Sequence, residues 1–190
     1  MKSFTKVALV AALGLSAVGA MAGEVVDSGI FANGVVNSSI GLNSKALQNI
    51  GVAENTAKIK NTAVIVNGAA NTAVGVSATA RQNIGHATGN SEISRTAIVA
   101  QGVSNTSGGL FSTAEQDIGF ARGNGKVLDS FISAVGAVNT AGGLKATALQ
   151  QIGGATGNGV LRNADVVSNG AINSAGGIFS SAEQRIGVAR

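Results

Sequence analysis

The sequence repeats itself five times with a constant period of 34 residues. A segment of the form Ala-x-Gln-x-Ile-Gly recurs without insertion or deletion, so the units span residues 21–54, 55–88, 89–122, 123–156 and 157–190. Its glutamines are Gln48, Gln82, Gln116, Gln150 and Gln184. A fixed period of this length is typical of repeat architectures, in which each unit buries its apolar face against its neighbours.

Equivalent positions of the five units form columns, and the second half of each unit has its constrained columns two residues apart. An aliphatic column comes first, then Ser or Ala, then Ala, then Gln, then Ile, while the columns between them vary. This alternation predicts a β-strand with one buried face, since a helix would space such columns by three or four. We expect both aliphatic columns to face the interior: Leu42, Val76, Leu110, Leu144, Ile178 and Ile50, Ile84, Ile118, Ile152, Ile186.

The first half of each unit has two apolar columns that lie five residues apart. A bulge or bend must separate them if both point inward. The columns are Val25, Ile59, Ile93, Val127, Leu161 and Ile30, Val64, Ile98, Ile132, Val166. We therefore interpret each unit as strand, turn, strand, turn.

Glycine and asparagine recur at the first turn of every unit. Glycine adopts positive φ without steric cost, which suits a corner between strands. The turn glycines are Gly34, Gly68, Gly102, Gly136 and Gly170, and the asparagines three residues later are Asn37, Asn71, Asn105, Asn139 and Asn173.

The predicted fold is an all-β solenoid of five 34-residue rungs, a cross-β stack with about 4.8 Å between rungs. Helical tetratricopeptide repeats share this period, but the units lack the Trp, Tyr and Pro positions of that repeat and are rich in glycine, which disfavours helix. In the solenoid the Gln and Asn columns form stacking ladders. Each amide can donate to one neighbour and accept from the other, so a slip in register would leave amides unpaired.

The first residues and the composition indicate secretion. Residues 1–22 begin with Lys2 and Lys6, continue through an apolar stretch and end at Ala20-Met21-Ala22, which predicts a signal peptide and a mature chain of residues 23–190. No apolar run reaches the roughly 20 residues of a membrane span. The chain has no cysteine, and its net charge of +4 comes from scattered basic residues, so we expect no disulfide and no nucleic-acid partner.

The ends of the repeat array favour self-assembly. Soluble repeat proteins carry atypical terminal units, whereas the first and last units here resemble the others. We expect both end rungs to expose unpaired strand edges on which another copy can add. The predicted partner is therefore the chain itself, as a homopolymer.

The turn motif resembles that of curlin-type functional amyloids of Gram-negative bacteria and, more loosely, of Fap-type fibre subunits. The curlin motif contains Gln-x-Gly-x-x-Asn-x-Ala. Here each unit has Gly-x-x-Asn-x-Ala or Gly-x-x-Asn-x-Ser, as in Gly68-x-x-Asn71-x-Ala73, and the glutamine lies in the other strand. The resemblance implies a secreted subunit of an extracellular amyloid fibre on the cell surface, used for adhesion and biofilm cohesion. It also implies two partners, a nucleator subunit and an outer-membrane secretion pore.

Catalysis is not expected, because no carboxylate recurs in a fixed column and the only histidine, His86, stands in a variable column. We expect His86 to be an exposed residue at a strand end. The Gly-Asn-Gly stretches match neither a phosphate loop nor a calcium repeat, so we predict no cofactor and no metal. The alternative function is a monomeric surface adhesin or an ice-binding protein, which would use the hydroxyl row of Thr79, Thr113 and Thr147.

Overall fold

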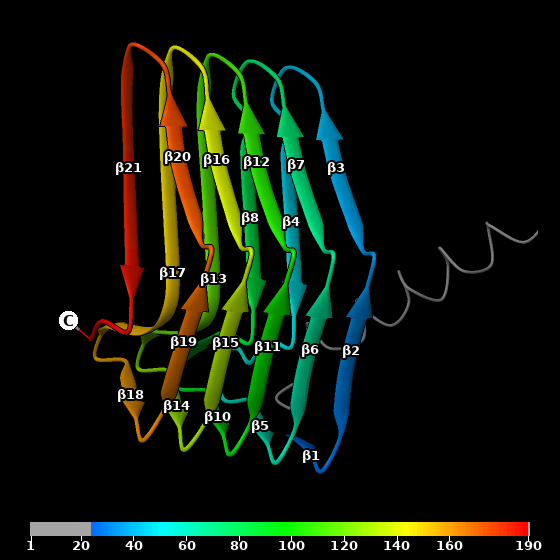
Figure 1. Cartoon of the computed structure of the whole chain (residues 1–190), viewed down its shortest axis with the longest axis vertical. Helices are drawn as coiled ribbons and strands as arrows, with labels where there is room; N and C mark the ends of the chain where they lie inside the picture. The colour runs from blue at the N-terminus through cyan, green and yellow to red at the C-terminus, as the bar shows by residue number, and fades with distance from the viewer. Residues whose placement is uncertain (1–23, 190) are drawn as a thin grey trace, which may run out of the picture.

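The computed structural model describes residues 24–189, and the predicted signal peptide, residues 1–22, lies outside them. The described residues contain strands and no helix, so none of their segments is a helix that could cross a membrane. Each 34-residue unit forms one rung, and the rungs stack side by side (Figure 1). The predicted β-solenoid is confirmed.

Four parallel sheets run along the stack, and each rung contributes one main strand to each sheet. Sheet 1 contains β1 (Glu24–Val26), β5 (Lys58–Lys60), β10 (Glu92–Ser94), β14 (Lys126–Leu128) and β18 (Val160–Arg162). Sheet 2 contains β2 (Gly29–Asn33), β6 (Ala63–Asn67), β11 (Ala97–Gln101), β15 (Phe131–Val135) and β19 (Asp165–Asn169).

The other two sheets face each other. Sheet 3 contains β3 (Val36–Ile40), β7 (Ala70–Val74), β12 (Ser104–Gly108), β16 (Val138–Gly142) and β20 (Ile172–Gly176). Sheet 4 contains β4 (Lys45–Ile50), β8 (Thr79–Ile84), β13 (Phe111–Gly123), β17 (Lys145–Gly157) and β21 (Phe179–Ile186), and the short β9 (Ala87–Gly89) pairs with β13. The interpretation of two strands per rung was therefore too coarse.

Every strand pair is parallel and in a register of 34 residues, as in Ile98 beside Ile132 and Gln116 beside Gln150. Each side chain consequently lies next to its counterpart in the neighbouring rung. The sequence period and the register of the sheets are thus the same quantity.

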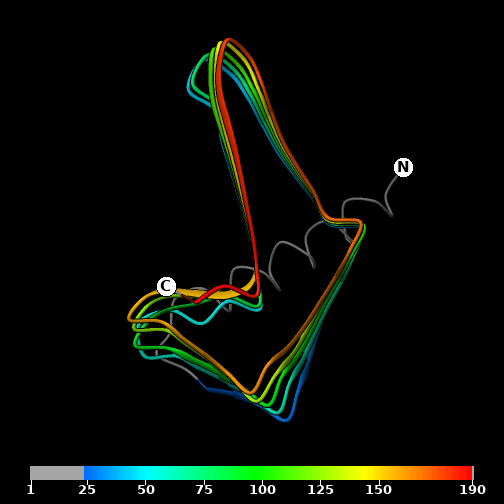
Figure 2. The ribbon, with the colours of Figure 1, turned by 60° about the vertical axis from the view of Figure 1, so that its left-hand side comes forward.

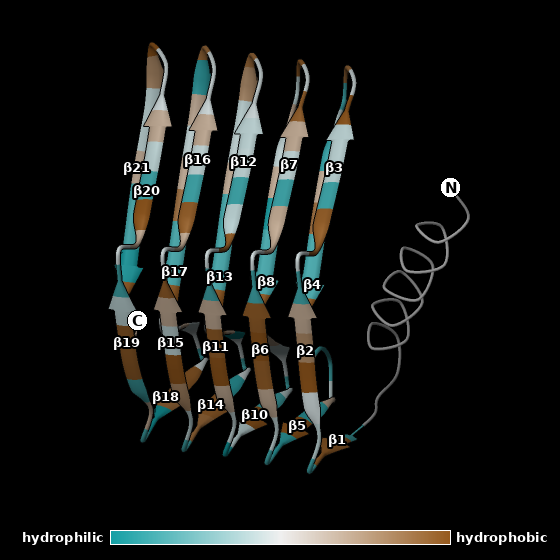
Figure 3. Ribbon diagram, turned by 45° about the vertical axis from the view of Figure 1, so that its right-hand side comes forward, coloured by the Kyte–Doolittle hydropathy of each residue, from teal (hydrophilic) through white to brown (hydrophobic). Residues whose placement is uncertain are grey.

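In cross-section a rung has a wide base and a narrow arm (Figure 2). We call the end of sheet 4 at Ile50, Ile84 and their counterparts its foot. The base is enclosed by sheets 1 and 2 and by the segment that follows this foot. It is filled by isoleucine and valine, among them Ile59, Val64 and Ile84. Sheets 3 and 4 form the arm, where alanines such as Ala73 and Ala80 pack between them. Figure 3 shows that the strands of sheet 2, which border the base, are largely apolar.

Positive φ angles mark the corners of the rung. The predicted bend between the two apolar columns of the first half is the corner between sheets 1 and 2, where Asp27 has a φ of 52° and its counterparts are alike. The turn glycines lie at the corner between sheets 2 and 3, with φ of 61° at Gly34 and 62° at Gly136. At the foot of sheet 4 the chain turns again at Gly85, where φ is 57°, and at its counterparts, where φ is 55–63°.

The column of Leu42, Val76, Leu110, Leu144 and Ile178 is not buried, contrary to the prediction. These side chains are 39–77% exposed. They belong to the tight corner between sheets 3 and 4, which precedes the first residue of each sheet 4 strand. The chain reverses direction at this corner, so the alternation of buried and exposed side chains in sheet 4 starts only after this column.

Candidate functional site

The glutamine column forms a ladder in the neck between base and arm. Gln82 Nε2 donates to Gln48 Oε1 at 2.8 Å, and Gln116 Nε2 donates to Gln82 Oε1 at 2.7 Å. The same bond links Gln150 to Gln116 at 2.7 Å and Gln184 to Gln150 at 2.5 Å. The ladder therefore runs through all five rungs, with every donor pointing from the later rung to the earlier one.

The glutamine amides also reach across the neck to the corner between sheets 2 and 3. Gln150 Nε2 lies 3.1 Å from the carbonyl oxygen of Ala137, and Gln184 Nε2 lies 3.3 Å from that of Ala171. Gln82, Gln116 and Gln150 are completely buried. Because a buried amide without partners costs free energy, this column fixes the register of sheet 4 on its neighbours.

The asparagine column forms a second ladder inside the arm, with the opposite donor direction. Asn37 Nδ2 donates to Asn71 Oδ1 at 2.9 Å, and Asn71 Nδ2 donates to Asn105 Oδ1 at 2.8 Å. Asn105 and Asn139 continue the row to Asn173. Each amide also donates to sheet 4, as Asn71 does to the carbonyl oxygen of Arg81 at 2.8 Å. The ladder thus ties the two sheets of the arm together.

The isoleucine column lies at the foot of sheet 4 and fills the base. Ile50, Ile84, Ile118 and Ile152 are at most 1% exposed. Ile186 of the last rung is 43% exposed, because no further rung covers it within the described residues.

The two end rungs present different surfaces. In β21 the side chains are exposed except for partly buried Arg185, whereas in β4 they alternate between exposed and buried. Gln48 at the first rung is buried, yet its Nε2 has no hydrogen-bond partner among the described residues 24–189. Each end of the stack is also an edge of all four sheets.

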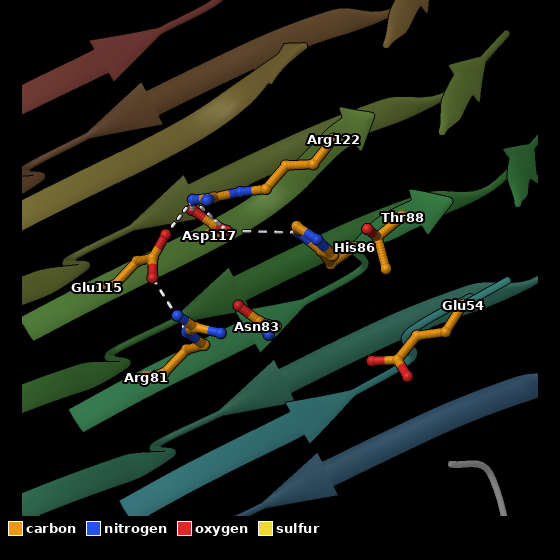
Figure 4. Close-up of a pocket in the computed structure, with 8 residues that line it drawn as sticks. All are labelled: Glu54, Arg81, Asn83, His86, Thr88, Glu115, Asp117 and Arg122. Carbon is orange, nitrogen blue, oxygen red and sulfur yellow. Dashed lines mark hydrogen bonds and ion pairs between the residues drawn. The ribbon is translucent and has the colours of Figure 1, made fainter. Parts of the chain in front are cut away.

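A cluster of charged side chains lies on the outer side of the foot of sheet 4. The chain turns sharply there, so the outer face of sheet 4 and the following segment form a concave angle (Figure 2). Arg122 Nη2 lies 2.9 Å from Asp117 Oδ2 and donates to Gln151 Oε1 at 2.6 Å. It also pairs with Glu115, whose other carboxylate oxygen lies 3.0 Å from Arg81 Nε (Figure 4).

His86 belongs to this cluster, and the expectation that it is exposed was wrong. It is 4% exposed, and its Nδ1 lies 3.4 Å from Asp117 Oδ2. His86 points outward, but the concave angle places it against Phe120 and Asp117. Burial, together with the charges of Arg122 and Arg81, lowers the pKa of His86 to about 4, so the imidazole is neutral at pH 7.

Burial also raises the pKa of Asp117 to about 7, against the opposing effect of Arg122. Asp117, Glu115 and Arg122 were not predicted from the sequence as site residues. A signal was present, because the column of Asn49, Asn83, Asp117, Gln151 and Arg185 is polar in every unit and precedes a corner by two residues. The prediction of no catalytic residues and no cofactor stays a prediction.

No protein-family model matches the chain, and no curated protein or solved structure is significantly similar to it.

Proposed function

We propose that the chain is a secreted structural subunit that self-assembles, end rung on end rung, into extracellular amyloid-like fibres for adhesion and biofilm matrix. The observation that carries this proposal is the Nε2 of Gln48 at one end of the glutamine ladder, which no acceptor in the described part of the chain reaches. At the opposite end, Gln184 lies exposed, and no donor within residues 24–189 reaches its Oε1.

A second copy that continues the 34-residue register would pair the free hydrogen-bonding groups at both ends of the ladders. Its Gln48 Nε2 would donate to Gln184 Oε1 of the first copy, as each later rung does within the chain. In the asparagine ladder, Asn173 Nδ2 would donate to the second copy's Asn37 Oδ1. The two donor directions therefore favour the same head-to-tail arrangement.

The other columns also match across such a junction. Ile186 would cover the second copy's Ile50, and the turn glycines Gly170 and Gly34 would stack. Each added copy buries exposed apolar surface and pairs the open edges of four sheets, which favours growth.

The first test is a time course on residues 23–190 released from denaturant, followed by thioflavin fluorescence and electron microscopy. The proposal predicts a lag and then growth of unbranched, detergent-resistant fibres. A stable β-rich monomer that does not bind the dye would refute it.

A cysteine pair tests the junction itself, since the chain has no cysteine of its own. Lys45 and Ser181 stand in one exposed column of sheet 4, at opposite ends of the stack. The variant with Lys45→Cys and Ser181→Cys should form disulfide-linked oligomers on oxidation, because strands about 4.8 Å apart fall within disulfide range. In the control, Lys45→Cys is combined with Val160→Cys in sheet 1, and this pair should not link.

The alternative of ice binding through the threonine row has less support. Thr113 and Thr147 are exposed on sheet 4. The neighbouring exposed column contains Phe111 and Phe179, which interrupt a flat hydroxyl surface.

A further inference from the structure

A pocket opens beside the charged cluster, within the concave angle. Its volume is about 140 Å³, and it is lined from three rungs by Glu54, Arg81, Asn83, His86, Thr88, Glu115, Asp117 and Arg122. By the same measure a single water needs about 10–15 Å³, so the pocket has room for a small molecule.

Three buried polar atoms at this pocket have no hydrogen-bond partner within the part of the chain that the structure describes. They are Asn83 Oδ1, His86 Nδ1 and Arg122 Nε. Asn83 is 8% exposed and His86 4%, so both side chains are more than nine-tenths buried. Buried polar groups are nearly always paired, with protein, water or a ligand. The pocket therefore offers at least one acceptor, at Asn83, and one donor, at Arg122, to a molecule that enters it.

The charges of the pocket are already largely balanced. Arg81 and Arg122 pair with the carboxylates of Glu115 and Asp117. His86 is neutral at pH 7, so its ring has one donor and one acceptor nitrogen. A free anion would meet the carboxylates of Glu54, Glu115 and Asp117, and a free cation would meet two guanidinium groups. The balance favours a neutral ligand.

A hydroxyl group both donates and accepts, whereas an ammonium group only donates and a phosphate mainly accepts. We propose that this pocket binds the vicinal hydroxyls of a sugar residue, between Asn83 and Arg122, with Thr88 and Glu54 at its open side. Figure 4 shows Thr88 and Glu54 on the side of the pocket away from the paired arginines, with Asn83 beside Arg81 and His86 beside Asp117.

The pocket does not depend on the fibre proposal. It lies on the side of the stack and is lined by rungs one to three, so a copy added at either end leaves it open. In a fibre it would recur once per copy, on one face.

The single histidine makes binding directly observable. The full chain, labelled in its histidine, is titrated with D-glucose, D-galactose, D-mannose and N-acetyl-D-glucosamine while the ring resonances of His86 are recorded by NMR. Fibres, if they form, are measured by solid-state NMR. We expect a saturable shift with at least one sugar, and none with phosphate, ammonium or calcium at equal concentration. A shift with one of the ions alone, or no shift with any probe, overturns the proposal.

Two variants test whether the sugar binds in this pocket. Thr88→Val removes a partly buried hydroxyl at the pocket, and Thr147→Val removes an exposed hydroxyl elsewhere on sheet 4. Thr88→Val should weaken sugar binding by about fivefold to tenfold, the loss of one hydrogen bond, and Thr147→Val should not change it. Equal affinities of both variants would overturn the assignment to this pocket, whether or not the chain polymerises.

Discussion

Replacement of Gly109 by alanine should separate neighbouring rungs, because its corner has no space for a methyl group. A Cβ at this position would lie 1.6 Å from the carbonyl oxygen of Gly75 and 2.8 Å from its carbonyl carbon. Both are backbone atoms of the adjacent rung, so no side-chain rotation relieves the overlap. The corner must open, at the expense of two backbone hydrogen bonds of 2.9 Å, from Gly75 N to Gly108 O and from Gly109 N to Gly142 O.

At about 0.5–1.5 kcal/mol each, these bonds give a loss of about 1–3 kcal/mol in the free energy of unfolding. With a typical dependence on urea, the unfolding midpoint should fall by about 1 M. The measurement is urea unfolding of freshly refolded chain, followed by circular dichroism.

The adjacent Gly108 provides the control, since no atom lies within 4 Å of a Cβ built there. Its column contains Ile40 and Val74, so side chains fit. Gly108→Ala should leave the midpoint unchanged or raise it slightly, because alanine loses less backbone entropy on folding. Equal midpoints for the two variants would refute the close approach of the rungs at Gly109.

Three further predictions concern the ladder and the charged cluster. Gln116→Leu should slow fibre growth in the thioflavin assay far more than Thr113→Leu on the outer face of the same strand, because it leaves neighbouring buried amides unpaired; equal growth curves would contradict a role of the ladder in register. The folded-state pKa of Asp117 is raised to about 7, so the contribution of Asp117 to stability is lost as pH rises from about 4 to 7. The folded-state pKa of His86 is lowered to about 4, so the contribution of His86 is lost as pH falls from 6.5 to 4. Urea unfolding across this range should therefore show stability falling with rising pH in His86→Gln and rising with pH in Asp117→Asn, and identical slopes would contradict these shifts. Arg122→Gln should destabilise the chain by about 1–3 kcal/mol in the same assay, because the buried Asp117 loses its charged partner while Glu115 keeps Arg81, and an unchanged midpoint would contradict the ion pair.

Most of the fold can be predicted from the 34-residue period of the sequence. In a parallel in-register stack the spacing between equivalent residues is the length of one rung, so the 34-residue period determines both the register and the columns. The alternation that ends in the Gln and Ile columns likewise locates sheet 4 and its buried face. The sequence did not reveal that the Leu42 column is exposed, because this column lies two residues before the buried column of Ser44 and so continues the alternation of the strand.

The charged cluster could not be predicted from alternation alone. Asp117 and His86 occupy outward positions, which alternation assigns to solvent. They are buried because the chain turns sharply at Gly85 and its counterparts, so that the following segment and the outer face of sheet 4 line one concave angle. The angle of that turn cannot be predicted from the residue types that recur in a column.

The most direct test of head-to-tail stacking is the helical rise of the assembled fibre, measured by cryo-electron microscopy. Five rungs at about 4.8 Å predict a rise of about 24 Å per copy, with four parallel sheets continuing across every junction and Gln184 beside the next copy's Gln48. A fibre whose copies meet side by side, with the end rungs uncovered, would contradict the account.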